Sequence, residues 1–301
     1  CSFDTQLNSI FHTKVQQALR KSQLEHEKDW SKDNHQTGQK FNISYIDNSV
    51  IPYNLREDYF LIGIDISEGL GQDSTVMKIR KLFWNVEKKK MEFKLIGILR
   101  DNEMPVEEFA THSLNYFKLF NPDKLRVVVE NNNYGGEYFN QIDNLVRFVP
   151  EYSDFDNIVF AKFMRASKDD FERGVRWDGV KKKTGVTAYK TLITDGIFDD
   201  TNSESIDESL NFGRNSSGTY AAQFGHDDLV MSDVTMGYYV KINNLFSREY
   251  LLNAEAALRE ILNDIPEEKK VELEIIEREK NNVYTHNGFT LRNSAKEVAR
   301  K

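Results

Sequence analysis

The sequence has little cysteine and no long apolar run, and each shortage excludes a class of protein. One Cys among 301 residues excludes a disulfide framework and a Cys-rich zinc site, and it suits a reducing cytosol. No stretch approaches the roughly 18 consecutive apolar residues of a membrane span. No basic start followed by an apolar run is present, so no secretory signal is predicted. A hydrophobic share of 39% with 29% charged residues instead indicates a globular protein with a sizeable core.

An excess of positive charge is also absent. The chain carries 40 Lys+Arg against 48 Asp+Glu, and this net charge of −8 argues weakly against a nucleic-acid partner. The charge is unevenly spread, however. Residues 162–190 hold nine basic and four acidic residues, whereas residues 249–279 hold ten acidic and four basic ones. Each run alone is most simply a solvated face, but the basic window leaves a nucleic-acid partner open.

We expect three regions along the chain. Residues 1–56 are a polar lead-in with a short helix near 15–28 and a strand near 43–45, and the absence of Met at position 1 suggests a piece of a longer polypeptide. Residues 57–246 show strong periodicity and are predicted to form the main domain. Residues 247–301 are predicted to be a charged helical extension.

The main domain is predicted to be an α/β fold. Strands at 59–65, 74–84 and 91–99 with tight links indicate an antiparallel meander. A helix at 105–120, a strand at 125–130 and a helix at 134–145 complete a βββαβα order. Further elements are predicted as a strand at 158–163, a helix at 184–196, a hairpin within 210–224 and an apolar helix at 226–245.

Acidic residues follow two of these strands. Asp65 closes the first strand and Glu130 closes the fourth. If the first strand is central and the fourth runs parallel beside it, the two carboxylates meet at one edge of the sheet, where α/β proteins bind ligands. Two carboxylates at such a short distance repel each other unless a cation lies between them. Mg²⁺ prefers oxygen ligands of this kind.

Two more acids open the apolar helix. On a helical projection Asp227 lies on the apolar face with Met231 and Val234, while Asp228 lies about 100° away. An unpaired charge on a packing face is costly, so a shared metal would explain Asp227. Simple helix capping by Asp227 and Asp228 is the alternative. Asp73 follows a Gly-rich turn after Asp65 and is expected to return near it if the turn folds back as a hairpin.

Three segments together resemble motifs of a known family, the nuclease domain of the large terminase subunits of tailed bacteriophages. The resemblance is dense from about residue 59 to 239 and weak outside it, and the motifs occur in the family's order with comparable spacing. The segments are Leu61-Ile62-Gly63-Ile64-Asp65-Ile66-Ser67-Glu68-Gly69-Leu70-Gly71-Gln72-Asp73, Val129-Glu130-Asn131-Asn132 and Gly225-His226-Asp227-Asp228-Leu229-Val230-Met231-Ser232.

The resemblance implies an RNase H-like mixed sheet flanked by helices and a metal-dependent endonuclease that cuts concatemeric DNA at the start and end of genome packaging. Asp65, Glu130, Asp227 and Asp228 match the family's metal-binding acids, and Asp73 matches a further acid used in its first motif. The implied cofactors are Mg²⁺ or Mn²⁺ in a two-metal site. The helical projection favours Asp227 over Asp228 as the principal ligand.

The resemblance also implies partners and a location. The partners are double-stranded DNA, the terminase ATPase domain, the portal protein and the small terminase subunit, in the host cell cytoplasm and transiently on the procapsid portal. The chain contains no Gly-x-x-x-x-Gly-Lys-Ser/Thr sequence, so we expect it to cut DNA without ATPase activity.

The basic window is the predicted contact for the DNA backbone, since phosphate contacts need positive charge and no sequence-reading motif. The predicted contact residues are Arg176, Lys181, Lys182, Lys183 and Lys190. His226 is either an auxiliary proton-transfer residue or simply a residue at the start of its helix. The acidic extension either covers the site, docks on a partner or is a solvated helix.

Two other interpretations stay open. The chain could be another RNase H-like nuclease, such as a Holliday-junction resolvase or transposase core, for which a preference for branched DNA would be diagnostic. It could also be a non-catalytic packaging module that binds DNA or portal, against which the retention of all the acids argues. An actin-like sugar-kinase fold is disfavoured because its Gly-Thr-rich phosphate loops are missing.

Overall fold

A computed structural model of the chain defines most of its first 245 residues. It describes residues 9–32, 43–47, 54–71, 73–85, 88, 90–132, 134–155, 159–164, 171–215, 218–243 and 245. The predicted charged extension at 247–301 lies outside the described residues, as do residues 165–170 of the basic window. No helix within the described ranges has the length and apolar character needed to cross a membrane.

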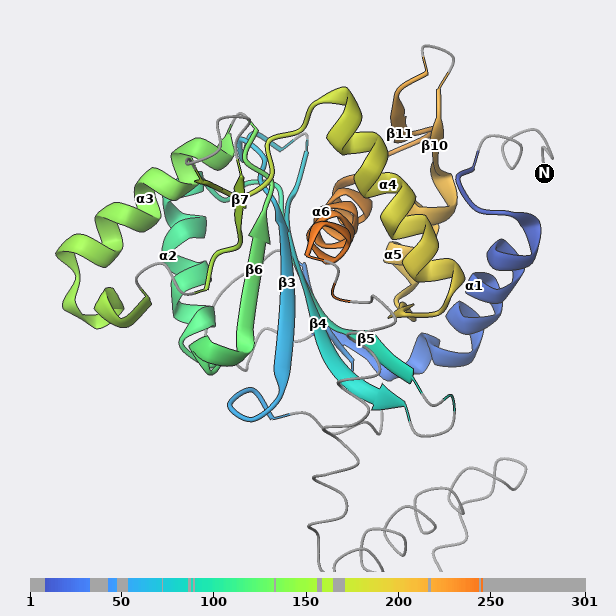
Figure 1. Cartoon of the computed structure of the whole chain (residues 1–301), viewed down its shortest axis with the longest axis horizontal. Helices are drawn as coiled ribbons and strands as arrows, with labels where there is room; N and C mark the ends of the chain where they lie inside the picture. The colour runs from blue at the N-terminus through green and yellow to red at the C-terminus, as the bar shows by residue number, and fades with distance from the viewer. Residues whose placement is uncertain are drawn as a thin grey trace, which may run out of the picture. The chain divides into compact units, whose positions relative to one another are not determined.

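The described residues form a seven-stranded mixed sheet at the centre of the fold (Figure 1). Four of its members are β3 (Tyr59–Asp65), β4 (Thr75–Asn85), β5 (Lys90–Asp101) and β6 (Leu125–Val129). Strands β3, β4 and β5 pair antiparallel in succession, and β6 lies parallel to β3 on its other side. The predicted meander and mixed sheet are therefore confirmed.

Short elements from distant parts of the chain extend this sheet. They are β1 (Trp30–Lys32), β2 (Ile43–Asp47) and β9 (Phe198–Asp199). Strand β2 pairs with β5 and β1 pairs with β2, so part of the segment predicted as a lead-in belongs to the sheet. The preceding helix α1 (Thr13–His26) contacts α5 (Ser203–Asn211), and η2 (Glu27–Asp29) links α1 to β1. The strand predicted near 43–45 is confirmed as β2, whereas β1 and β9 are too short to carry a periodicity that the sequence would reveal.

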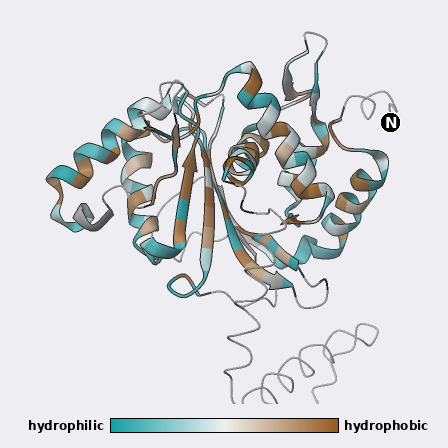
Figure 2. Ribbon diagram, in the orientation of Figure 1, coloured by the Kyte–Doolittle hydropathy of each residue, from teal (hydrophilic) through white to brown (hydrophobic). Residues whose placement is uncertain are grey.

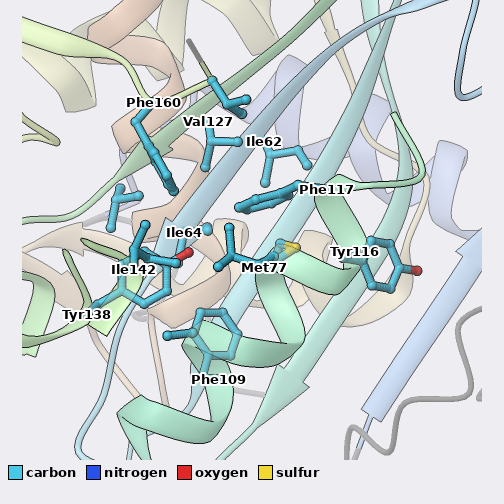
Figure 3. Close-up of a cluster of buried hydrophobic side chains, with 14 of the residues drawn as sticks. Ile62, Ile64, Met77, Phe109, Tyr116, Phe117, Val127, Tyr138, Ile142 and Phe160 are labelled. Atoms are coloured by element: carbon cyan, nitrogen blue, oxygen red, sulfur yellow. The ribbon is translucent and has the colours of Figure 1, made fainter. Parts of the chain in front are cut away.

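Two helices cover one face of the sheet. They are α2 (Val106–Phe117) and α3 (Tyr134–Phe148), joined to the neighbouring strands and loops through η3 (Pro122–Lys124) and η4 (Pro150–Phe155). Figure 3 shows their aromatic side chains, among them Phe109, Phe117 and Tyr138, packed on Ile62, Ile64 and Val127 of the strands. Burial of this cluster is the main source of stability on this side of the sheet.

The opposite face is covered by α6 (Asp228–Ile242), with α4 (Gly179–Thr194) and α5 beside it (Figure 1). Two hairpins complete the fold: β7 (Lys162–Met164) with β8 (Phe171–Arg173), and β10 (Phe212–Arg214) with β11 (Tyr220–Ala222). In Figure 2 the central strands carry hydrophobic stretches, while α1 and α3 at the periphery alternate hydrophobic and hydrophilic residues.

Helix α6 is buried on nearly all sides, and this corrects the helical projection of the sequence. Every residue from position 228 to 238 is buried, including the polar Ser232, Asp233 and Thr235. A projection assumes one apolar face and one solvent face, but α6 is enclosed by the sheet, α4 and α5. The projection favoured Asp227 over Asp228 because it placed only Asp227 on an apolar face, and this premise was wrong.

A buried group of four charged residues ties α6 to the sheet, and no local pattern in the sequence indicates it. Lys78 and Arg80 of β4 are both fully buried and face Asp233 of α6. Asp200 lies 3.3 Å from the Lys78 ammonium and 3.5 Å from the Arg80 guanidinium. Burial alone would raise the pKa of Asp233, but Arg80 and Lys78 outweigh it and the pKa lies below its ordinary value.

Candidate metal centre

A cleft of about 580 Å³ opens at the edge of the sheet where β3 and β6 end. It is bounded by the loop after β3, the residue after β6, the first turn of α6 and the first turn of α4. Among the described residues, the charged side chains that line it are Asp65, Glu68, Asp73, Glu130, Asp227, Asp228 and Lys182. Six acids facing one lysine make the cleft strongly negative.

Asp65 and Glu130 are neighbours because their strands are parallel. Ile64 of β3 is in register with Val129 of β6, and the backbone N–H of Glu130 donates to the carbonyl oxygen of Ile64 at 2.8 Å. The predicted placement of these two strand ends is confirmed. Burial raises the pKa of Asp65 well above its ordinary value, and repulsion from Glu130 and the two aspartates of α6 raises it further.

Glu130 is also partly buried, and its partners are polar rather than apolar. Burial raises the pKa of Glu130, whereas hydrogen bonding from Trp177 and the charge of Lys182 oppose that rise. The indole N–H of Trp177 donates to Glu130 Oε2 at 2.8 Å. Sequence reasoning missed Trp177 because nothing local connects it to Glu130 before the fold is known.

The two aspartates at the start of α6 have different surroundings. Asp227 precedes the helix, makes no capping bond through its side chain, and accepts a hydrogen bond from the Ala222 N–H at 3.2 Å. Asp228 is buried and accepts from the Ser74 N–H at 3.0 Å, with Arg100 3.5 Å away. Burial raises the pKa of Asp228 despite these two partners. Both side chains line the cleft, so neither is explained as a helix cap.

Arg100 and Glu208 form hydrogen bonds that fix the start of α6. The Arg100 guanidinium contacts the Ser74 hydroxyl at 3.0 Å and Glu208 at 3.1 Å. Glu208 Oε2 in turn accepts the Leu229 N–H at 2.9 Å. Burial raises the pKa of Glu208 to about 7, although Arg100 lowers it. Neither residue is part of a sequence motif, and both were missed.

A second group of possible ligands joins two acids of this cleft, Asp73 and Asp228, to His226. Single ligand atoms of Asp73, His226 and Asp228 all lie within 4.8 Å of one another. His226 Nδ1 is 3.8 Å from Asp73 and 4.0 Å from Asp228. The turn after β3 thus brings Asp73 into the same cleft as Asp65, as the predicted hairpin required. His226 comes just before α6 and lies beside Asp73 and Asp228.

The predicted DNA contacts do not all reach the cleft. Of the five, Lys182 lines it, because Asp178 caps α4 through the N–H groups of Val180 and Lys181 and so starts the helix beside the acids. Lys181 donates to the carbonyl oxygen of Arg176 at 3.3 Å, Lys183 is exposed on the same first turns, and Lys190 lies further along α4. Arg176 is paired instead with Glu172 at 3.3 Å.

The cleft residues fit a divalent metal ion by the chemistry of their donors. Carboxylate oxygens are the ligands that Mg²⁺ and Mn²⁺ prefer, and an imidazole is compatible with Mn²⁺. Burial, and then neighbouring carboxylates, raise the pKa of Asp65, Glu130 and Asp228, so these acids need positive charge to ionise together. Lys182 supplies one such charge, which is too little for all of them.

Some solved structures are similar to this chain, while no family model and no curated protein sequence matches it. One is the large terminase nuclease of the thermophilic phage G20c with bound magnesium, at 17% identity and a TM-score of 0.45, covering 69% of this chain and 89% of that one. Another is the human cytomegalovirus terminase nuclease domain, at 14% identity and a TM-score of 0.38, covering 69% and 94%. At this identity the likeness is distant, and what the cleft can do follows from its own residues.

Proposed function

We propose that this chain is a metal-dependent endodeoxyribonuclease, the nuclease domain of a terminase large subunit. The observation that carries the proposal is that acids from distant parts of the sequence meet in one cleft. The three motifs that resemble that family are far apart in the sequence, and their acids Asp65, Glu130 and Asp227/Asp228 line one cleft. A divalent ion bound in the cleft would neutralise these carboxylates.

The acids offer two groups of ligands. Asp65, Glu130 and Asp227 would hold one ion, and Asp73, His226 and Asp228 would hold a second. When bound, paired ions supply an activated water and stabilise the leaving oxygen of a phosphodiester. Asp65 interacts with both groups, since Glu130 of the first group and Asp228 of the second both raise its pKa.

The protein's own part is to bind and orient the DNA backbone. Lys182 reaches into the cleft, where its ammonium would contact a phosphate oxygen next to the acids. Lys181 and Lys183 flank it on the first turn of α4 and would contact neighbouring phosphates. Backbone contacts of this kind carry no base information, which supports cutting with little sequence preference.

We further propose that the substrate is concatemeric viral DNA, cut at the start and end of packaging in the host cytoplasm. A terminase ATPase domain, a portal protein and a small terminase subunit would be the protein partners. These assignments rest on the motif resemblance and on the missing phosphate-binding loop of an ATPase.

Cleavage of supercoiled plasmid tests the proposal. We expect nicking and linearisation in Mg²⁺ or Mn²⁺, none in EDTA, and loss of at least about 100-fold in rate for Asp65→Asn, since one ligand and one charge are removed. Asp207→Asn is the matched control, because Asp207 is a half-exposed carboxylate on α5 that pairs with Arg20.

Three results would contradict the proposal. Full activity of Asp65→Asn would show that the cleft is not the site of cutting. A strong preference for four-way junctions over linear duplex would favour a resolvase-like enzyme. Salt-sensitive DNA binding with no cutting in any metal would indicate a non-catalytic packaging module.

A further inference from the structure

The indole of Trp177 makes a direct hydrogen bond to one of the acids of the cleft. Its Nε1–H donates to Glu130 Oε2 at 2.8 Å. Trp177 itself does not line the cleft, so it approaches Glu130 from the protein side.

The backbone around Trp177 is fixed to the strand end that carries Glu130. The Val175 N–H donates to the carbonyl oxygen of Val129, and the Asn131 N–H donates to that of Val175, each at 2.7 Å. The Trp177 N–H donates to Asn132 Oδ1 at 2.9 Å. The segment before α4 therefore pairs with the chain at the end of β6, where Glu130 lies.

The ring of Trp177 is fixed by two helices. It meets Tyr238 of α6 edge to face, with ring centroids 5.5 Å apart at 70°. Gly185 of α4 provides the space on another side, because a Cβ there would lie 2.9 Å from the indole Cη2 and 3.0 Å from Val234. The donor thus has a single orientation, set jointly by β6, α4 and α6.

We propose that Trp177 is a positioning residue that orients the Glu130 carboxylate toward a divalent metal ion, an inference that rests on the metal site of the proposed function. A neutral donor suits this role. It fixes one oxygen of the carboxylate and leaves the negative charge undiminished for the ion, whereas a lysine or arginine at the same place would compete with the ion. Outer partners of metal ligands typically contribute 10- to 100-fold in metal affinity.

Trp177→Phe tests the inference, since it keeps an aromatic ring against Tyr238 and Gly185 but removes the donor. Trp30→Phe is the matched control, because the Trp30 indole donates to Thr201 Oγ1 at 2.9 Å and lies outside the cleft. The readout is Mn²⁺ binding by isothermal calorimetry, without DNA. Thermal denaturation in EDTA establishes that both variants are folded.

We expect Trp177→Phe to bind Mn²⁺ about 10-fold more weakly than the wild type, and Trp30→Phe to bind it unchanged. In plasmid cleavage the Mn²⁺ concentration for half-maximal rate should rise by the same factor for Trp177→Phe, with most of the rate recovered at saturating metal. Trp177→His, which retains a ring N–H, should recover part of the affinity.

Equal Mn²⁺ affinities of folded Trp177→Phe and wild type would overturn the inference, and so would an equal weakening in Trp30→Phe. If Trp177→Phe does not fold, the fluorescence of Trp177 itself is measured instead. In a Trp30→Phe/Trp84→Phe chain Trp177 is the one tryptophan left, since the sequence has three. Its fluorescence should change on adding Mn²⁺, and an unchanged signal overturns the inference.

The two proposals fail separately. The wild type could bind Mn²⁺ but cut no DNA, while Trp177→Phe binds Mn²⁺ more weakly. That result would contradict the nuclease function and support the positioning role. A chain that cuts plasmid with the same metal dependence in Trp177→Phe as in the wild type would do the reverse.

Discussion

The hydroxyl of Ser232 in α6 donates to the carbonyl oxygen of Gly63 in β3 at 2.9 Å. This bond is possible because Gly63 has no side chain: a Cβ there would lie 2.5 Å from the Ser232 carbonyl oxygen and 2.8 Å from Met236. Helix and strand therefore touch backbone to backbone. Asp65 is two residues along β3, and Asp227 and Asp228 begin α6, so this contact sets the spacing of the acids.

Gly63→Ala should displace α6 from the sheet. Overpacking a filled core typically costs about 1–3 kcal/mol, and a backbone carbonyl cannot swing aside as a side chain can. We expect lower stability in urea denaturation together with weaker Mn²⁺ binding by calorimetry. Both should change, because the same contact supports the core and the cleft.

Gly97→Ala is the control for this prediction. Gly97 lies on β5, and a Cβ there would come 3.4 Å from the end of the Ile79 side chain, which is an ordinary contact. We expect stability and metal binding close to those of the wild type. If Gly63→Ala were as mild as Gly97→Ala, the close approach of α6 to β3 would not set the geometry of the cleft.

Reversing the charge of Lys181 and Lys183 should weaken DNA binding and lower its salt dependence. Lys182 is left intact because it lines the cleft, and changing it would mix binding with chemistry. For duplex DNA, removing one lysine–phosphate interaction should reduce the slope of log K against log salt by about 0.9. Fluorescence anisotropy with labelled duplex at several salt concentrations measures that slope.

Lys118→Glu/Lys124→Glu carries the same change of charge at the other end of the sheet, since Lys124 immediately precedes β6 and Glu130 follows it. This control should retain most of the slope. A slope that fell equally in both double variants would indicate a general effect of net charge rather than a DNA contact on α4.

The sequence predicted the part of the fold in which local pattern and tertiary environment agree. Strand β3 has the predicted bounds, and its burial as a central strand matches its unbroken apolar run. The parallel pairing with β6 then placed Asp65 beside Glu130. Helix α6 departed from the prediction, because enclosure on nearly all sides removed the facing difference on which the ranking of Asp227 and Asp228 depended.

The features that the sequence did not predict depend on long-range contacts. Trp177 meets Glu130 because the segment after β8 pairs beyond the end of β6, and no local signal encodes that pairing. Arg100 and Glu208 come from a strand and from a short helix that was not predicted. Which acids hold metal, and the DNA contacts on α4, stay predictions until they are measured.

Stability should depend on pH and metal together. Burial raises the pKa of Asp65, Glu130 and Asp228 in the folded chain, so the folded state holds protons that the unfolded state has already released. This contribution is fully present below the ordinary carboxyl pKa of about 4 and is lost as pH rises through the raised values. Mg²⁺ needs the ionised acids and should replace the lost stability.

Thermal denaturation at pH 5 and pH 8, with EDTA or with Mg²⁺, measures this linkage. We expect Mg²⁺ to raise the melting temperature more at pH 8 than at pH 5. Asp65→Asn should reduce that difference, because it removes a carboxyl whose pKa is raised well above its ordinary value by burial and by neighbouring acids. A Mg²⁺ shift of the same size at both pH values would contradict the coupling of the acids to the ion.

The buried charged group behind the cleft should be far more sensitive to substitution than an exposed ion pair. Asp233→Leu leaves the fully buried Lys78 and Arg80 with Asp200 as their remaining acidic partner in the group. Breaking a buried pair on one side typically costs about 3–5 kcal/mol, because an uncompensated charge stays in the core. Asp207→Ala removes the exposed pair with Arg20 instead, and such pairs contribute about 0–1 kcal/mol. Urea denaturation of both variants should separate them by several kcal/mol, and a similar small loss in both would mean that water reaches Lys78 and Arg80.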